Sequence, residues 1–276
     1  MTRKRLAVLG QPISHSRSPA MHNAALAELG LADEWSYEAI EVAPPDFEAL
    51  LRRMAAEGFV GANVTVPHKI AALELADEAT ETARAIGAAN TLSFAAGRIA
   101  AENTDAAGFL DSLPSPPACR RALVVGAGGS ARAVVWALVT NGAEVEIWNR
   151  TPERAKRLAD DLAASVAEPA DGGLRTADYD LIVNATTVGM GASSQQPADL
   201  KSLPFDADAL AETQLLVDLA YGPAETELAR VAAARGATVV DGLEVLVRQG
   251  AASLRIWTGQ EPPIETMRRA ARATPV

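Results

Sequence analysis

A glycine-rich segment at residues 126–131 has the spacing of a nucleotide-binding loop. It consists of Gly126, Ala127, Gly128, Gly129, Ser130 and Ala131, a GxGxxA pattern. The apolar run before it, Ala122–Val125, predicts a strand, and Ser130–Thr140 predicts a helix. Between a strand and a helix, such glycines let backbone N–H groups approach a pyrophosphate at the positive end of the helix. The pattern therefore predicts a dinucleotide site.

The next apolar run, Glu144–Trp148, does not end in the acidic residue that is typical of an NAD site. It is followed by Asn149, Arg150 and Thr151, where a carboxylate would otherwise bind the ribose 2′-hydroxyl. Arg150, and Arg154 one helical turn later, can instead offer guanidinium donors to a 2′-phosphate. This favours NADP over NAD, the alternative being two solvated arginines at the start of a helix.

Polar side chains gather in four short segments of the first half of the chain. These segments are Ser14–Asn23, Asn63–Lys69, Gly87–Thr91 and Asn103–Asp105. We expect them at the ends of strands, and in an open α/β sheet ligands bind outside the carboxyl ends of the strands. Their hydroxyl, amide, ammonium and carboxylate groups suit a small, polyhydroxylated anion. Of the four lysines in the chain, Lys69 alone lies in such a segment.

The elements that must position these residues alternate between apolar runs of strand length and alanine-rich helical stretches. In the first half we expect strands at Leu6–Leu9, Trp35–Val42 and Gly61–Val66, and helices at Ser18–Glu28, Asp46–Glu57 and His68–Leu75. This alternation predicts a parallel sheet covered by helices. The segment Asp111–Cys119 is rich in proline and serine and predicts a linker or surface loop.

The alternation resumes after this segment and predicts a second sheet. Its expected strands are Ala122–Val125, Glu144–Trp148, Leu181–Val183, Leu215–Leu219 and Thr238–Val240. We therefore expect an α/β protein in which a second domain covers about residues 106–241. The helical patterns at Leu243–Ile256 and Ile264–Ala271 can return to pack on the first domain.

The composition excludes several classes of protein. Of the 276 residues, 49% are hydrophobic and 22% are charged, as in ordinary globular proteins. The 25 basic and 35 acidic residues give a net charge of −10, which argues against generic binding to nucleic acid or an anionic membrane. No stretch approaches the roughly 20 apolar residues of a membrane span. The apolar run Leu6–Gly10 is also too short for a secretory signal, so we expect a cytoplasmic protein.

A metal centre is not expected either. The single cysteine, Cys119, excludes an intramolecular disulfide and a cysteine-based zinc site. It has no activating base nearby in the sequence, so we do not expect a nucleophile. The histidines at 15, 22 and 68 have no second cluster of carboxylates beside them and are expected to be structural.

The chain resembles the shikimate dehydrogenase family over nearly its whole length. The segments that carry the resemblance are, in order, GQPISHSRSPAMHN, GANVTVPHK, GAANT, ENTDAAG, GAGGSARA, NRT, NATTVGM, DLAYGPAET and DGLEVLVRQGA. The resemblance implies reversible, NADP-dependent reduction of 3-dehydroshikimate to shikimate, in the route to chorismate and the aromatic amino acids. It also implies a substrate domain, 1–105 plus 242–276, and an inserted Rossmann-type NADP domain, 106–241. The implied partner is a small molecule, and the implied state is a monomer or a homodimer.

The resemblance assigns substrate ligands to the first domain. Ser16 and Ser18 match the hydroxyls that hold the substrate carboxylate. Thr65, Asn90 and Gln249 match the ligands to the ring hydroxyls, and Gln249 requires the C-terminal helix to fold back. From the residues alone, the serines would be an ordinary helix cap, and the other three would be polar residues satisfied near an element end.

Lys69 and Asp105 match the catalytic pair of the family. Hydride transfer at ring C3 changes a ketone into an alkoxide or the reverse, so the site needs a group that exchanges a proton there. We expect Lys69 to be the acid/base, and Asp105 to orient it and to bind a substrate hydroxyl. The alternative is an exposed ion pair.

The resemblance places further contacts in the second domain. Thr186 and Met190 match the loop that approaches the cofactor, and Leu219 and Gly242 match positions near the nicotinamide. Tyr221 matches a position at the substrate. A site built from two domains implies a cleft that closes on its ligands.

Two positions depart from the commonest family pattern, and other functions stay open. Thr187 stands where proline is frequent, and Leu254 stands where an aromatic residue is usual.

One alternative function is that of a quinate/shikimate dehydrogenase that accepts NAD, against which Ser18 and Arg150 argue. A relative that acts on an aminated substrate is a weaker alternative. Another is a non-catalytic NADP-binding regulator, against which the presence of Lys69 and Asp105 argues.

Overall fold

The computed structural model describes residues 3–118, 120–170, 173–190, 199–222 and 224–273. The chain forms two compact units: unit 1 is Met1–Gly108 with Leu246–Val276, and unit 2 is Phe109–Val245. The sequence places these boundaries a few residues earlier, at 105/106 and 241/242. The observed boundaries fall inside helices because α5 (Asp105–Ser112) and α9 (Gly242–Thr258) run through them without a break.

Unit 1 contains a six-stranded sheet in the order β2-β1-β3-β5-β6-β4. The strands are β1 (Lys4–Gly10), β2 (Trp35–Glu41), β3 (Phe59–Val64), β4 (Glu78–Ala79), β5 (Thr91–Ala95) and β6 (Arg98–Glu102). Strand β1 is parallel to β2 and β3, and β4 is parallel to β6, but β5 is antiparallel to both β3 and β6.

The predicted parallel sheet is confirmed for β1, β2 and β3, but the sequence did not predict β5 and β6, and β5 is antiparallel to both of its neighbours. Strands β5 and β6 form a hairpin closed by Ala96 and Gly97, which have φ values of 50° and 74°. Two successive positive φ angles are typical of the tight turns whose twist matches that of paired strands. A two-residue connection leaves no room for a crossover helix, so an analysis based on strand–helix alternation passes over both strands.

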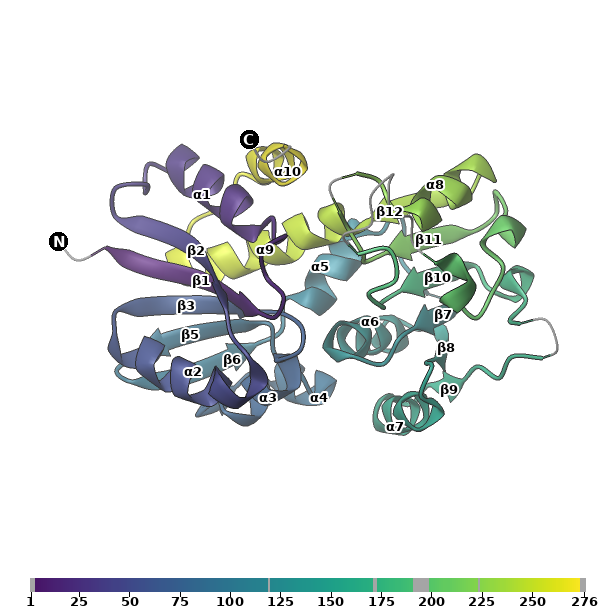
Figure 1. Cartoon of the computed structure of the whole chain (residues 1–276), viewed down its shortest axis with the longest axis horizontal. Coiled ribbons are helices and arrows are strands. Elements are labelled where there is room, and N and C mark those ends of the chain that lie inside the picture. Colours follow the sequence, from purple (N-terminus) through teal and green to yellow (C-terminus); the bar gives the residue numbers. More distant parts are fainter. Residues whose placement is uncertain (1–2, 119, 171–172, 191–198, 223, 274–276) are drawn as a thin grey trace. The chain divides into compact units, whose positions relative to one another are not determined.

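Helices cover both faces of the unit 1 sheet (Figure 1). On one face, α1 (Ser18–Glu28), α9 and α10 (Ile264–Arg272) pack against Leu6 and Val8 of β1. On the other face, α2 (Phe47–Ala56) and α3 (Lys69–Glu74) pack against Ala7 and Leu9. The alternation along β1 follows the two-residue period of a strand. The expected return of the C-terminal helices to the first domain is confirmed. The remaining helix of this unit, α4, spans Glu81–Ile86.

Unit 2 contains a fully parallel sheet in the order β12-β11-β10-β7-β8-β9. The strands are β7 (Arg121–Val125), β8 (Glu144–Trp148), β9 (Ser165–Val166), β10 (Leu181–Asn184), β11 (Leu215–Asp218) and β12 (Thr238–Asp241), and the helices are α6 (Gly129–Thr140), α7 (Pro152–Leu162) and α8 (Glu227–Ala234). From β9 to β12 this is the 3-2-1-4-5-6 order of the Rossmann fold, with its switch point between β7 and β10. The expected Rossmann-type domain is confirmed.

The predicted linker Asp111–Cys119 is only partly a loop. Asp111 and Ser112 form the end of α5, residues 113–118 are outside regular structure, and Cys119 lies outside the described residues. A proline at 114 accounts for the end of the helix, because the residue before a proline is driven out of the helical region.

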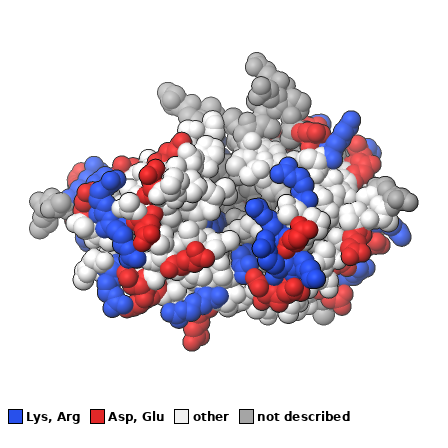
Figure 2. All heavy atoms as spheres, turned by 60° about the horizontal axis from the view of Figure 1, so that its bottom comes forward, with Lys and Arg blue, Asp and Glu red and all other residues white. Residues whose placement is uncertain are grey.

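Among the described helices, none is long and apolar enough to cross a membrane. On the face shown in Figure 2, basic and acidic side chains are interspersed.

Candidate active site

A buried ion pair joins Lys69 to Asp105 in unit 1. Lys69 is the first residue of α3 and Asp105 the first of α5. The Lys69 Nζ atom lies 2.6 Å from Asp105 Oδ2, and the two side chains are 9% and 14% exposed. The alternative of an exposed ion pair is therefore wrong. Because burial of two charges is costly, a pair in this setting is weak evidence for stability and a good candidate for chemistry.

Asn90 holds the other oxygen of the same carboxylate. Its Nδ2 donates to Asp105 Oδ1 at 2.9 Å and to Gln249 Oε1 at 3.0 Å, and its Oδ1 accepts from the Thr104 N–H at 2.7 Å. Asn90 is only 2% exposed. The structure thus brings together four of the residues singled out in the sequence, including Gln249, which is 159 positions away from Asn90.

The mixed sheet explains why these residues meet. Asn90 precedes β5, whereas Asp105 follows β6, so the expectation that both would follow strands is wrong for Asn90. Since β5 is antiparallel to β3 and to β6, the start of β5 lies beside the carboxyl ends of both neighbours. The hairpin therefore carries the chain away from this edge of the sheet and returns it there.

Helix α9 approaches this edge through a close contact with α5. A Cβ atom at Gly108 would lie 2.5 Å from Gln249 N and 2.7 Å from Gln249 Cα, closer than neighbouring atoms pack. Gly108 is three residues after Asp105, which places both on one side of α5. The absence of a side chain at Gly108 thus lets Gln249 lie next to the residues around Asp105.

Ser16, Ser18 and Thr65 lie at the same edge of the sheet. The serines follow β1 and Thr65 follows β3, and these strands are parallel neighbours. Helix α1 begins at Ser18, whose N–H donates to Ser16 Oγ at 3.3 Å. The Thr65 N–H donates to Leu9 O at 2.8 Å, which fixes Thr65 beside the end of β1. The three hydroxyl residues are thus grouped by the pairing of β1 with β3.

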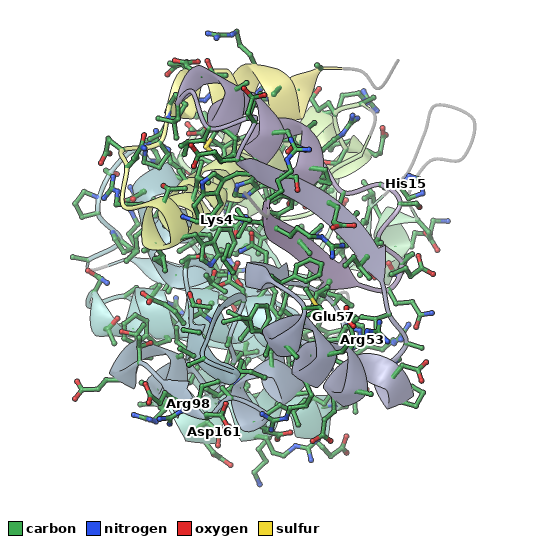
Figure 3. All side chains as sticks on the ribbon, turned by 90° about the vertical axis from the view of Figure 1, so that its left-hand side faces the viewer. Lys4, His15, Arg53, Glu57, Arg98 and Asp161 are labelled. Carbon is green, nitrogen blue, oxygen red and sulfur yellow. The ribbon has the colours of Figure 1, made fainter. Side chains whose placement is uncertain are left out.

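The histidines make structural contacts. His22 is fully buried and its ring stacks on Tyr37, with 4.1 Å between centroids. Neither ring nitrogen has a hydrogen-bond partner among the described residues, and burial lowers the pKa of His22 to about 3. His68 donates through Nε2 to Val42 O at 2.8 Å and stacks on Phe47. His15 is exposed on the loop after β1 (Figure 3). Over the same described ranges, no group of three His, Cys, Asp or Glu could hold a metal ion.

In unit 2, the glycine loop lies at the switch point of the sheet. Gly126 follows β7 and has φ +118°, and a Cβ atom there would lie 2.9 Å from Ala185 O, in the loop after β10. Helix α6 begins at Gly129, and no side chain caps it at Gly128, where an added Cβ would meet nothing within 4 Å. Ala127, Ser130 and Ala131 complete the turn into α6. An open helix N-terminus at a switch point fits a pyrophosphate.

Arg150 and Arg154 flank the start of α7, directly after β8. Both side chains are exposed, and within the described ranges neither guanidinium forms an ion pair. Asn149 Nδ2 donates to Thr151 O at 3.0 Å, which closes the turn between them. Strand β8 is the parallel neighbour of β7, so these cations and the glycine loop lie at one edge of the sheet. The arrangement fits a dinucleotide with a 2′-phosphate.

Thr186 shapes the loop after β10. Its hydroxyl donates to Asn184 Oδ1 at 2.6 Å, and Asn184 Nδ2 donates to Asp218 Oδ1 at 2.8 Å. Asp218 also accepts from Thr226 Oγ1, and burial raises the pKa of this carboxyl. Asp218 and Thr226 were not predicted from the sequence, in which the only signal is an acidic residue at the end of an apolar run.

The other residues assigned to unit 2 surround this loop or the strands beside it. Met190 is 48% exposed, and Thr187 is also exposed. Leu219 N–H donates to Asn184 O at 2.9 Å. Tyr221 is half-buried after β11, and Gly242 is the first residue of α9.

Comparison with known proteins covers almost the whole chain. Residues 8–92 match the model of the shikimate dehydrogenase substrate binding domain, residues 114–244 match shikimate / quinate 5-dehydrogenase, and residues 242–272 match the shikimate 5′-dehydrogenase C-terminal domain. A curated relative, the shikimate dehydrogenase (NADP(+)) of Methanopyrus kandleri, is 44% identical over 95% of this chain and 93% of its own length.

Solved structures agree in fold. Shikimate 5-dehydrogenase from Thermus thermophilus, in complex with NADP(H) and shikimate, has a TM-score of 0.85 and 42% identity, covering 98% of both chains. Quinate dehydrogenase from Corynebacterium glutamicum, in complex with NAD, has a TM-score of 0.82 and 32% identity, covering 98% of this chain and 99% of its own. With these matches to all three family models and to a full-length relative, the chain belongs to the shikimate dehydrogenase family.

Proposed function

We propose that this chain catalyses the reversible, NADP-dependent reduction of 3-dehydroshikimate to shikimate. The observation that carries the proposal is the buried Lys69–Asp105 pair, 2.6 Å apart, at the sheet edge that also holds Asn90 and Gln249. In support, the Methanopyrus kandleri relative is named shikimate dehydrogenase (NADP(+)), and the Thermus thermophilus enzyme was solved in complex with NADP(H) and shikimate. In this proposal unit 1 binds the substrate and unit 2 binds the cofactor.

NADPH bound by unit 2 would supply a hydride to ring C3 of the substrate. The carbonyl oxygen then needs a proton, and Lys69 Nζ is placed to donate it in reduction and to remove it in oxidation. Asp105 keeps the ammonium in place through Oδ2 and accepts from a substrate hydroxyl. Asn90 keeps the carboxylate oriented through Oδ1, so one carboxylate holds two donors at separate oxygens.

Four more residues of unit 1 hold the substrate in this proposal. Ser16 and Ser18, at the start of α1, bind the carboxylate, because hydroxyl groups and a helix N-terminus both stabilise an anion. Thr65 and Gln249 bind ring hydroxyls, and Asn90 completes that set. Tyr221 contributes from unit 2.

In unit 2, the residues at the carboxyl edge of the parallel sheet bind the cofactor. Residues 126–131 hold the pyrophosphate, and Asn149, Arg150, Thr151 and Arg154 hold the adenosine ribose with its 2′-phosphate. Thr186, Met190, Leu219 and Gly242 lie toward the nicotinamide. We further propose that the enzyme works in the cytoplasm, as a monomer or a homodimer.

Quinate is the competing substrate, because a family model and a solved relative both bear its name. The Corynebacterium glutamicum enzyme was solved with NAD, whereas this chain has two exposed arginines, Arg150 and Arg154, near the end of β8 and no acid among the three residues directly after the strand. Arg150 and Arg154 therefore favour NADP and the shikimate reaction.

The test measures absorbance at the reduced-nicotinamide band with the purified full chain. Shikimate and quinate are each offered with NADP and with NAD. We expect rapid reduction with shikimate plus NADP only. Lys69→Ala should abolish turnover while shikimate binding persists, and Lys201→Ala, which removes an exposed lysine of unit 2, should leave both unchanged. Equal activity with quinate or with NAD would instead indicate a quinate/shikimate dehydrogenase of broader specificity. NADP binding without any turnover would indicate a non-catalytic NADP-binding regulator.

A further inference from the structure

Ser253 of α9 lies at the centre of a buried polar cluster. The residue is 0% exposed. Its Oγ donates to Gln249 O at 3.0 Å and accepts from Asn63 Nδ2 at 2.8 Å. The same oxygen lies 2.8 Å from Thr91 Oγ1 and 3.1 Å from Thr104 Oγ1. One hydroxyl thus joins helix α9 to strands β3 and β5 and to the segment before α5.

Three hydroxyls form the core of this cluster, which we term the hydroxyl triangle: Thr91, Thr104 and Ser253. Each oxygen lies within 3.1 Å of the other two. Asn63 Nδ2 and Asn90 Nδ2 donate into the triangle, while the Gln249 carbonyl can only accept from it. Asn90 Oδ1 is a second acceptor, 3.2 Å from both the Thr91 and the Thr104 hydroxyl, and Ser253 donates to the main-chain oxygen of Gln249.

The triangle is connected to the proposed active site at two points. Ser253 lies one helical turn after Gln249 on α9. Thr104 directly precedes Asp105, and its N–H donates to Asn90 Oδ1 at 2.7 Å. Asn90 in turn donates to Asp105 Oδ1 and to Gln249 Oε1. A shift of the Ser253 oxygen would therefore change both the hydrogen bonds of Thr104 and the position of Gln249.

Packing alone does not call for a serine at this place. Burial of a hydroxyl needs compensating hydrogen bonds, whereas an alanine would fill nearly the same space at no such cost. The apolar residues of α9, such as Leu254 at 0% exposure, already hold the helix on the sheet. In a low-dielectric interior, a fully satisfied network mainly fixes geometry.

We propose that Ser253 is a positioning residue for the reaction. Its hydroxyl fixes Thr104, and through it Asn90 and Asp105, and it fixes the turn of α9 that presents Gln249 to the substrate. It acts through these residues and does not contact the reacting atoms. This inference rests on the proposed function.

The experiment compares Ser253→Ala with the matched control Thr258→Val. Thr258 lies on the same helix and also donates to the carbonyl four residues earlier, Leu254 O at 2.7 Å. Both variants thus lose a helix hydroxyl, but only one loses the triangle. For Ser253→Ala we expect the KM for shikimate to rise about fivefold to tenfold, the scale of one lost hydrogen bond. The KM for NADP should stay within about twofold, because the cofactor site lies in unit 2.

Two further variants test how the effect is transmitted. Ser253→Thr keeps the hydroxyl and should restore the KM for shikimate to near the unaltered value. Because part of the effect of Ser253 passes through Gln249, the double variant Ser253→Ala/Gln249→Ala should raise the KM for shikimate by less than the product of the two single effects, whereas independent effects would multiply. Should Ser253→Ala fail to fold, Ser253→Cys replaces it in the same comparisons.

Three results would overturn the inference: equal kinetic effects in Ser253→Ala and Thr258→Val, a lowered melting temperature of Ser253→Ala with an unchanged KM, or multiplicative effects in the double variant. The unaltered chain is assayed in the same mixtures. If it does not oxidise shikimate, the proposed function itself fails. If it does and Ser253→Ala matches it, only the role of Ser253 fails.

Discussion

Asn90 and Asp105 are joined by a 2.9 Å hydrogen bond from Nδ2 to Oδ1, which leaves Asp105 Oδ2 to Lys69 at 2.6 Å. One carboxylate is thus held at both oxygens, by an amide on one side and an ammonium on the other. The amide comes from the residue before β5 and the carboxylate from the residue that starts α5. The β5–β6 hairpin is the element that sets their separation.

Removal of the Asn90 amide should therefore lower the activity of the folded enzyme, beyond any loss of activity caused by a smaller folded fraction. We expect Asn90→Ala to lower kcat/KM for shikimate by about tenfold to a hundredfold, the range found when an orienting partner of a reactive group is lost. The control is Asn103→Ala. Asn103 is also buried: its Nδ2 donates to Ala88 O at 2.9 Å and its Oδ1 accepts from the Ala106 N–H at 3.3 Å, so it supports the start of α5 but does not hydrogen-bond the Asp105 carboxylate among the described residues. Similar kcat/KM values in the two variants would contradict the orienting role.

Arg150 should determine the choice of cofactor. Replacement of one guanidinium at a 2′-phosphate removes a charge-assisted contact worth about 1.5–3 kcal/mol. We therefore expect Arg150→Ala to raise the KM for NADP by roughly tenfold to a hundredfold and to leave activity with NAD unchanged. Arg230→Ala, on α8, removes an exposed arginine that pairs with Glu227 and should change neither. If Arg150→Ala raised the KM for NADP and the KM for NAD to the same extent, Arg150 would not bind the 2′-phosphate.

Gly126 and Gly128 should respond differently to alanine. At Gly126 the φ of +118° and the nearby Ala185 O exclude a Cβ atom, so Gly126→Ala should destabilise unit 2 by about 1–3 kcal/mol. Gly128 has φ −93° and open space at its Cβ position, so Gly128→Ala should fold normally and weaken only NADP binding. Denaturant unfolding and NADP titration check the two effects. Equal stability of both variants would contradict the local geometry.

Acid should unfold the protein partly through His22. Burial lowers the pKa of His22 to about 3 in the folded state, whereas an unfolded histidine titrates near 6.5. Between these values the unfolded state binds up to one more proton, so the free energy of unfolding falls as the pH falls, by at most about 1.4 kcal/mol per pH unit. This contribution is complete above about pH 6.5 and is lost progressively from there down to about pH 3.

Denaturant unfolding of His22→Gln from about pH 7 to about pH 4 tests this. The variant should be less stable than the unaltered chain at neutral pH because it loses a ring stacked on Tyr37, and the gap should narrow as the pH falls. Carboxyl groups that titrate in this range are common to both proteins and cancel in the difference. If the difference in the free energy of unfolding between His22→Gln and the unaltered chain does not change with pH, the lowered pKa of His22 is contradicted.

Much of unit 2 follows from the sequence by itself. The strand, the glycine turn and the helix at 121–140 are contiguous, so their geometry depends on local backbone preferences and apolar periodicity. The same holds for the two arginines after β8, whose place is set by a short turn. The strands of a parallel sheet buried on both faces are continuous apolar runs, which is why Leu181–Asn184 and Leu215–Asp218 could be recognised.

The centre of the proposed site in unit 1 was decided by tertiary structure. The types of Lys69, Asn90, Asp105 and Gln249 were readable, but their grouping depends on a hairpin that strand–helix alternation does not predict. The role proposed for Ser253 could not be predicted from the sequence, because its hydrogen-bond partners lie up to 190 positions away. Each of them is an ordinary polar residue in its own segment. Local preferences act over a few residues, whereas a hydrogen-bond network among distant segments exists only after the sheet and α9 have packed together.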